Sequence, residues 1–306
     1  MKTFEELKQE LLSRVENVGP LFWGIAVEQI KSAVVDCKTR SKLLNVIKAN
    51  WPWNIVCCAK FIDAAFLEEN FTGEELQAVG IYTSGEHETN KSCIVCGTAT
   101  VEVFDSEIVH AWDGVPMWPR DSVAVEAYGN ARVRAYNNVK VEAHNNAEVH
   151  AHDSTKVNAY DDVTVIAEDS VLVEAHGSAQ VTASDIATVR ARDNAQVYAH
   201  DRVEVEAYGS ARVEAYGSAT VKAFHCAKVI AFNSARVEAY GSATVEAIHT
   251  AKVIAHESAK VGAYGESYVE DYTGRNSWSQ DYSIVKDCNN HKIYVKKGNF
   301  EIVEVD

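Results

Sequence analysis

Residues 125–263 repeat one pattern of hydrophobic and polar positions with a period of eight. Valine stands at every eighth position from Val125 to Val261, eighteen times without a gap, and alanine follows two residues after each valine. The residue two places before the next valine is small or β-branched, and a turn pair such as Gly-Ser, Asp-Ser or Asn-Asn closes each octad. Within each octad, apolar and variable residues alternate, and turn residues stand at both ends. This pattern predicts a short strand and not a helix.

Strands this short, joined by such short turns, leave no room for crossover helices. They can only stack coil upon coil, which predicts a mainly β protein built on a parallel β-solenoid. Two octads per coil are favoured, because an interior of valine and alanine is thin and suits two closely facing sheets. Three octads per coil, with a triangular cross-section, stay the alternative.

The phase of the octads sets the boundaries of the array. Counting back in steps of eight leads to Cys93, and the alanine position is lost at Asp271. The array is therefore assigned to residues 93–272, with residues 81–92 as a linker.

Both flanking segments are expected to be caps, because the ends of a solenoid expose unpaired strand edges. Residues 1–80 show helical spacing and predict an α-helical domain, with segments at 25–47 and 55–67 after a first stripe formed by Phe4, Leu7, Leu11 and Val15. Residues 273–306 return to alternation in "SIVKD", "KIYVKK" and "FEIVEV", which predicts a small antiparallel β cap.

Charge and composition narrow the classes of partner. The chain has 44 acidic and 29 basic residues, a net charge of −15, which argues against direct nucleic-acid binding and against an anionic membrane surface. It lacks an apolar stretch of about 18 residues and a signal-peptide pattern, so we expect a soluble, cytoplasmic protein. Seven scattered cysteines, an odd number, indicate reduced thiols.

The motifs that suggest chemistry have structural interpretations. In "CIVC" the phase turns Cys93 inward and Cys96 outward, so the two thiols are expected on opposite faces of the strand. Histidines could share a metal only with three octads per coil, which would stack His152, His176 and His200. No nucleophile, phosphate-loop or zincin motif is present. We expect no catalytic residue, no cofactor and no metal.

The variable positions offer candidate binding residues. A flat ring often follows the inward alanine, and taking alternate octads gives one column of candidates: Tyr128, His144, Tyr160, His176, Arg192, Tyr208, Phe224, Tyr240 and His256. With two octads per coil these rings would lie about 4.8 Å apart and stack. The stack either only stabilises the coils or is also a docking surface for a protein partner. In the helical domain the candidate contacts are Trp23, Trp51 and Trp53, and homo-oligomers through the caps stay open.

The repeat "ARVEAYGSATVEA" (235–247) and the segment "GIYTSGEHE" (80–88) carry a family resemblance. They resemble octapeptide-repeat β-solenoid proteins of gut bacteria and their phages, in which a helical N-terminal segment also precedes the array. The resemblance covers most of the chain. It implies a phage or mobile-element origin and brings no catalytic residue.

The function expected from the sequence is a non-enzymatic, rigid repeat scaffold that presents protein-binding surfaces. One alternative is an acidic protein that mimics DNA and occupies a nucleic-acid-binding enzyme, although the array holds too many bases for a dense negative field. An enzyme within the helical domain is a third hypothesis.

Overall fold

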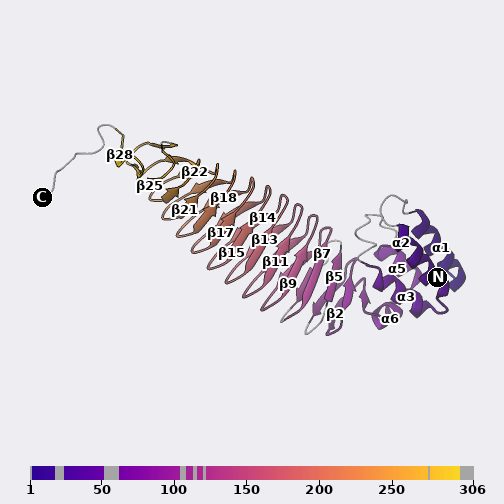
Figure 1. The fold of residues 1–306 in the computed structure, drawn as a ribbon. Coiled ribbons are helices and arrows are strands. Elements are labelled where there is room, and N and C mark those ends of the chain that lie inside the picture. The colour runs from indigo at the N-terminus through magenta and orange to yellow at the C-terminus, as the bar shows by residue number, and fades with distance from the viewer. Residues whose placement is uncertain are drawn as a thin grey trace. The chain divides into compact units, whose positions relative to one another are not determined.

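The computed structural model describes residues 2–17, 24–51, 62–103, 108–112, 116–119, 122–274 and 276–296. The fold is mainly β, with a parallel β-solenoid of about 12 turns, a few N-terminal helices and a C-terminal antiparallel strand pair (Figure 1). The fold class expected from the sequence is confirmed. The chain divides into two compact units, Met1–Arg134 and Ala135–Asp306, which are described in turn.

The first unit begins with helices. Those described are α1 (Phe4–Asn17), α2 (Gly24–Asp36), α3 (Arg40–Ala49), α5 (Ala64–Asn70) and α6 (Gly73–Ala78). Side-chain caps fix where three of them start: Thr39 accepts a backbone hydrogen bond at α3, Asp63 does so at α5, and Thr72 forms a capping box with Glu75 at α6. Arg40 at the start of α3 pairs with Glu75, and the Nε–Oε1 distance is 2.7 Å.

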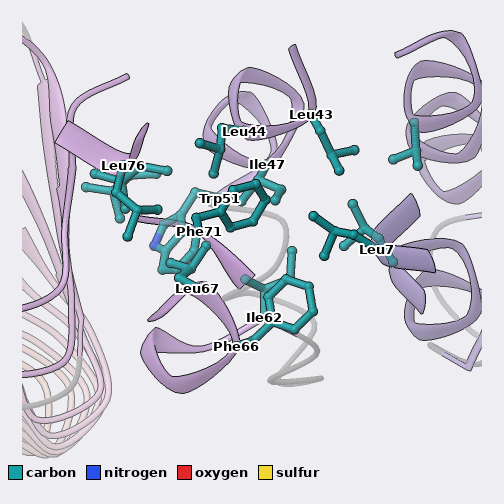
Figure 2. Close-up of a cluster of buried hydrophobic side chains, with 14 of the residues drawn as sticks. Leu7, Leu43, Leu44, Ile47, Trp51, Ile62, Phe66, Leu67, Phe71 and Leu76 are labelled. Atoms are coloured by element: carbon teal, nitrogen blue, oxygen red, sulfur yellow. The ribbon is translucent and has the colours of Figure 1, made fainter. Parts of the chain in front are cut away.

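The helices enclose a hydrophobic cluster (Figure 2). Leu7, Leu11 and Val15 of the predicted stripe are buried in it. Further members come from every other described helix and from the first strands of the solenoid, among them Ile30, Leu44, Phe66, Leu76, Ile81, Ile94 and Cys96. The stripe thus does what its spacing predicts, which is to bury one face of α1.

The first strands of the solenoid belong to the same unit: β1 (Ile81–Tyr82), β2 (Glu86–Thr89), β3 (Cys93–Val95), β4 (Thr100–Val103), β5 (Ile108–Trp112), β6 (Pro116–Pro119), β7 (Ala124–Tyr128) and β8 (Arg132–Ala135). Up to β27, odd-numbered strands follow one another in one sheet, here called sheet A, and even-numbered strands in a second, sheet B. All the described pairs in this unit are parallel.

The segment assigned as a linker from the sequence, residues 81–92, contains two strands of the solenoid. In the first coil Ile81 pairs with Ile94, and Glu86 pairs with Thr100. These steps are 13 and 14 residues long, whereas Cys93 pairs with Val109, 16 residues on. A count in steps of eight therefore cannot find this coil.

The second unit continues the same winding. Sheet A holds β9 (Lys140–Ala143), β11 (Lys156–Ala159), β13 (Leu172–Ala175), β15 (Thr188–Ala191), β17 (Glu204–Ala207), β19 (Thr220–Ala223), β21 (Arg236–Ala239), β23 (Lys252–Ala255), β25 (Tyr268–Asp271), β27 (Ile284–Asp287) and β28 (Lys292–Tyr294). Sheet B holds β10 (Glu148–Ala151), β12 (Thr164–Ala167), β14 (Gln180–Ala183), β16 (Gln196–Ala199), β18 (Arg212–Ala215), β20 (Lys228–Ala231), β22 (Thr244–Ala247), β24 (Lys260–Ala263) and β26 (Ser277–Ser279).

The register confirms two octads per coil. Each valine pairs with the valine 16 residues later, as Val205 does with Val221 and Val213 with Val229. The repeated valine and alanine positions face inward: from Val141 to Ala263 their exposure does not exceed 2%. Burying each valine contributes at least about 1.5 kcal/mol, and the repeat supplies such a side chain in every strand.

The C-terminal end departs from the prediction in two of the described strands. Strand β26 is parallel to β24 and already lies beyond residue 272. The run "SIVKD" contains β27, which is parallel to β25 and extends the solenoid beyond residue 272. Among the strands that the structure describes, only β28, from "KIYVKK", runs antiparallel, pairing Lys286 with Ile293. Counted in steps of eight from Val285, Ile293 occupies the inward valine position of a further strand. At the preceding small inward position stands His291, which adopts φ 55° in the turn that reverses the chain. The run "FEIVEV" lies outside the described residues.

Candidate functional site

The predicted column of rings exists in the second unit. We call it ring column A and define it as His144, Tyr160, His176, Arg192, Tyr208, Phe224, Tyr240, His256 and Tyr272. Each member follows the last residue of a sheet A strand, so backbone pairing repeats its position once per coil. Tyr128, the first residue of the prediction, lies in the other unit, where it packs against the hydrophobic cluster.

Neighbouring rings of this column are stacked. His144 and Tyr160 have ring centroids 4.9 Å apart at 8°, and Tyr160 and His176 have centroids 5.1 Å apart at 15°. A second run of four contacts joins Tyr208, Phe224, Tyr240, His256 and Tyr272, with centroid distances of 4.8–5.3 Å. Arg192 lies between the two runs, with Cζ 5.5 Å from the centre of the Tyr208 ring. The column is thus an ordered surface with one cation in it.

Tyr272 extends the column beyond the predicted set. It stacks on His256 and is 43% exposed. Its position can be predicted, because it lies 16 residues after His256. The sequence pattern ends the array one residue earlier, where Asp271 replaces the inward alanine.

A second set of rings, ring column B, follows the sheet B strands and is interrupted. Tyr136 stacks on His152, and His200, Tyr216 and Phe232 form a run with centroid distances of 4.8–5.0 Å. Glu168 and Ser184 separate the two groups. Column A therefore offers the longer continuous ring surface.

Glutamates anchor the tyrosines by their hydroxyl groups, which explains the recurrent phrase "VEAY". The Tyr208 hydroxyl donates to Glu206 at 3.3 Å, and the Tyr240 hydroxyl donates to Glu238 at 3.0 Å. Both residues of each pair face outward, two positions apart on one strand. Two effects raise the pKa of Tyr208: burial is the larger, and the negative charge of Glu206 is the second. The hydrogen bond to Glu238 is the largest cause that raises the pKa of Tyr240. Each ring is therefore held as a neutral donor.

The turn acids have a structural role. The residue after each ring position often has a positive φ, for example 56° at Asp193, a conformation that Gly, Asn and Asp tolerate. The Asp193 carboxylate accepts the backbone N–H of Gly177, one coil earlier, at 3.1 Å. Asp153, Asp161, Asp169 and Asp185 repeat this bond across the coils. The carboxylates thus satisfy backbone donors at the corners.

The "CIVC" motif lies where the solenoid meets the helical cluster of the first unit. Cys93 faces the interior, and burial raises the pKa of its thiol to about 12. Cys96 is also buried, as part of the hydrophobic cluster. Nearby, the Lys48 ammonium donates to the backbone oxygens of Val79 and Ser92 at 2.8 and 2.6 Å. The thiols are packing groups here, and Lys48 joins α3 to the first coils.

Trp51 is not available for the partner contact that the sequence suggested. Its side chain is 1% exposed because it packs in the hydrophobic cluster. Trp23 and Trp53 lie outside the described residues. In the described part of the chain, no three His, Cys, Asp or Glu side chains converge on a metal position. No described helix has the length and apolar character needed to cross a membrane.

Comparisons with known proteins add no relative. A scan against protein-family models, a search of curated proteins and a search of solved structures each found no match.

Proposed function

We propose that the protein is a non-enzymatic, rigid repeat scaffold of the cytoplasm, and that ring column A is the surface on which it binds a protein partner. The observation that carries the proposal is the stacked run from Tyr208 to Tyr272, whose rings are half-buried or exposed. Following the family resemblance, we extend the proposal to a phage or mobile-element origin.

Preorganisation supports this role. Stacking and the glutamate hydrogen bonds hold the rings in place before a partner arrives, so binding costs little further side-chain entropy. Aromatic residues dominate binding hot spots because they bury large apolar area with few rotatable bonds. A column with one residue per coil presents such area along several coils.

The DNA-mimic hypothesis has weaker support. Its best feature is a column of exposed aspartates, Asp153, Asp169, Asp185 and Asp201, with one charge per coil. Coils spaced about 4.8 Å apart give this column about a third of the axial charge density of duplex DNA, which carries one charge per about 1.7 Å. Three of these aspartates also accept backbone N–H groups, which offsets part of their negative potential.

Capture of partners from a host lysate, read by mass spectrometry, tests the proposal with full-length chains. The column A variant carries Tyr208→Ser, Phe224→Ser and Tyr240→Ser. The matched control carries His200→Ser, Tyr216→Ser and Phe232→Ser in column B, which removes an equal number of stacked rings. We expect a protein that the wild type and the control capture and the column A variant loses.

Two results would contradict the proposal. One is the same set of captured proteins, or none, with all three chains. The other is a partner lost only when Trp23 and Trp53 are replaced by alanine, which would move binding to the helical unit.

A further inference from the structure

Sheet B carries a trough on its outer face that ring column A does not use. It has a volume of about 300 Å³ and crosses the four strands β16, β18, β20 and β22. Its floor is the strand backbone at valines such as Val213 and Val229, whose side chains point inward. Its walls are two rows of outward side chains that lie two residues, or about 7 Å, apart on each strand. The trough therefore has room for one extended chain.

The two walls differ in their hydrogen-bonding groups. On one wall, here called the donor wall, every side chain can donate a hydrogen bond: Gln196, Arg212, Lys228 and Thr244. The facing wall, here called the acceptor wall, carries carboxylates between apolar groups: Tyr198, Glu214, Ile230 and Glu246. Register pairing repeats both walls once per coil. Donors thus face acceptors along the whole trough.

The charges of the trough balance and are not used against one another. Two cations face two anions, so the trough has no net charge. In the described part of the chain, no ion pair involves Arg212, Lys228 or Glu246. Glu214 accepts the Tyr216 hydroxyl at 2.5 Å through Oε2, and its Oε1 atom is not part of that bond. An uncharged chain rich in hydroxyl groups matches these walls, because each hydroxyl can accept from one wall and donate to the other.

Exposed aromatic rings stand at both ends of the row that forms the acceptor wall. Tyr198 begins it and is 36% exposed. Followed in register past Glu246 and Gly262, the row reaches Trp278, which is 44% exposed. A Cβ atom added at Gly262 would lie 2.7 Å from Cζ2 of Trp278, so the indole lies over this glycine and close to the sheet. The two rings are 80 residues apart in sequence, which is five coils or about 24 Å.

We propose that this row and the donor wall bind a linear, uncharged polysaccharide that lies along sheet B. Tyr198 and Trp278 stack on the C–H faces of two sugar rings, because the face of an aromatic ring is negative and attracts C–H groups. The hydroxyl groups between them bond to the donor wall and to the carboxylates of the acceptor wall.

An extended peptide matches the trough less well. Peptides that add to a sheet bond through their main chain to a free strand edge. The strands under the trough pair with neighbours on both sides, so their backbone groups are already used. The trough offers side chains alone, which suits the hydroxyl groups of a sugar chain. Because ring column A follows the strands of sheet A, this site is independent of the protein binding proposed there.

An array of linear oligosaccharides, read with labelled full-length protein, tests the class of ligand. It carries uncharged hexasaccharides of glucose, mannose, xylose and N-acetylglucosamine, which are long enough to reach from Tyr198 to Trp278, and two anionic chains, oligogalacturonate and heparin. We expect binding of at least one uncharged hexasaccharide and weaker binding of the corresponding disaccharide. No binding, or binding of the anionic chains alone, would overturn the proposal.

Calorimetric titration with the hexasaccharide that binds best tests the residues. Tyr198→Ala and Trp278→Ala should each raise Kd at least about tenfold. The matched control, Tyr294→Ala, removes an exposed ring from sheet A and should leave Kd unchanged. The serine variant of ring column A should also bind the hexasaccharide like the wild type, which separates this site from protein capture. Kd should differ less than about twofold between about 0.05 and about 0.5 M salt, because an uncharged chain forms no ion pairs that salt could screen.

The fluorescence of Trp278 reports on the stacking itself. It is the only tryptophan in the sequence of the second unit, and its emission is obtained as the difference between the wild-type and Trp278→Ala spectra. We expect this emission to shift to shorter wavelength on saturation, because a sugar ring displaces water from the indole. Equal Kd values for the wild type and the Trp278 variant, or an unshifted emission at saturation, would overturn the proposal.

Discussion

At the scale of single residues, the octad divides into inward positions with one task and outward positions with several. The alternation predicts the inward set because side chains on a strand alternate between faces. It does not predict that Asp193 bonds to Gly177, because that partner is set by the length of a coil. The stacking of Tyr208 on Phe224 follows from the sequence once two octads per coil are assumed.

Overpacking the interior tests the inward positions. Ala207 is fully buried, so Ala207→Leu should lower the free energy of unfolding by about 1–3 kcal/mol. Val213→Asp should cost more, because it buries a charge without a partner. Glu204→Leu, at an exposed position of the same strand as Ala207, is the control and should change stability little. Urea unfolding measures all three, and equal stability of the inward and outward variants would refute the assignment.

Tyr216 provides a pH test of the glutamate anchors. The hydrogen bond to Glu214 is the largest cause that raises its pKa, to about 12 from an ordinary value of 10.0. Since the folded state holds the phenol proton more tightly, the stabilisation is complete below about pH 10 and is lost as pH rises through about 12.

Carbon-13 NMR of the tyrosine ring measures this pKa. Glu214→Gln removes the charge and should bring the pKa of Tyr216 down towards 10, whereas Glu246→Gln, which is followed two residues later by Ile248, should leave it unchanged. A wild-type pKa of Tyr216 near 10 would show that the anchor does not hold in solution.

At the scale of elements, the ends of the array are harder to predict than its middle. The eight-residue phase locates the strands between Cys93 and Asp271, but the first coil has shorter steps and β28 reverses direction where the phase still holds. Both exceptions depend on neighbouring residues. In the first coil, Ile81 and Ile94 pack in the helical cluster. Before β28, His291 stands at the repeat position that is elsewhere a small, inward residue, and it adopts a positive φ. Helix α6 is only 6 residues long, which is too short for hydrophobic spacing to predict it.

Leu44 tests whether the helical cluster stabilises the first unit. Its side chain is fully buried, so Leu44→Ala should lower the stability of this unit by about 2–5 kcal/mol. Ser41→Ala, at an exposed position of the same helix, is the control. Thermal unfolding followed by circular dichroism at 222 nm should show the helical signal lost at lower temperature in the Leu44 variant only. Equal melting of both variants would mean that the cluster does not support the helices.

At the scale of the whole molecule, a solenoid gives each coil contacts mainly with its two neighbours, so a surface built from one residue per coil can change without loss of the fold. Scaffold and contact residues are therefore different positions of the repeat: valine and alanine specify the coil, while the positions of ring column A vary among Tyr, His, Phe and Arg. The sequence alone could place the ring column but could not say what binds to it. That depends on a partner whose chemistry the chain does not encode.

The central claim is that ring column A is the partner-binding surface, and the affinity of the captured partner for purified chains tests it most directly. Titration calorimetry would compare the wild type, the Tyr208, Phe224 and Tyr240 serine variant, and the column B control. We predict that Kd rises at least about tenfold, or 1.4 kcal/mol, for the column A variant and stays unchanged for the control. Equal Kd values for all three chains, with the fold intact by circular dichroism, would contradict the account.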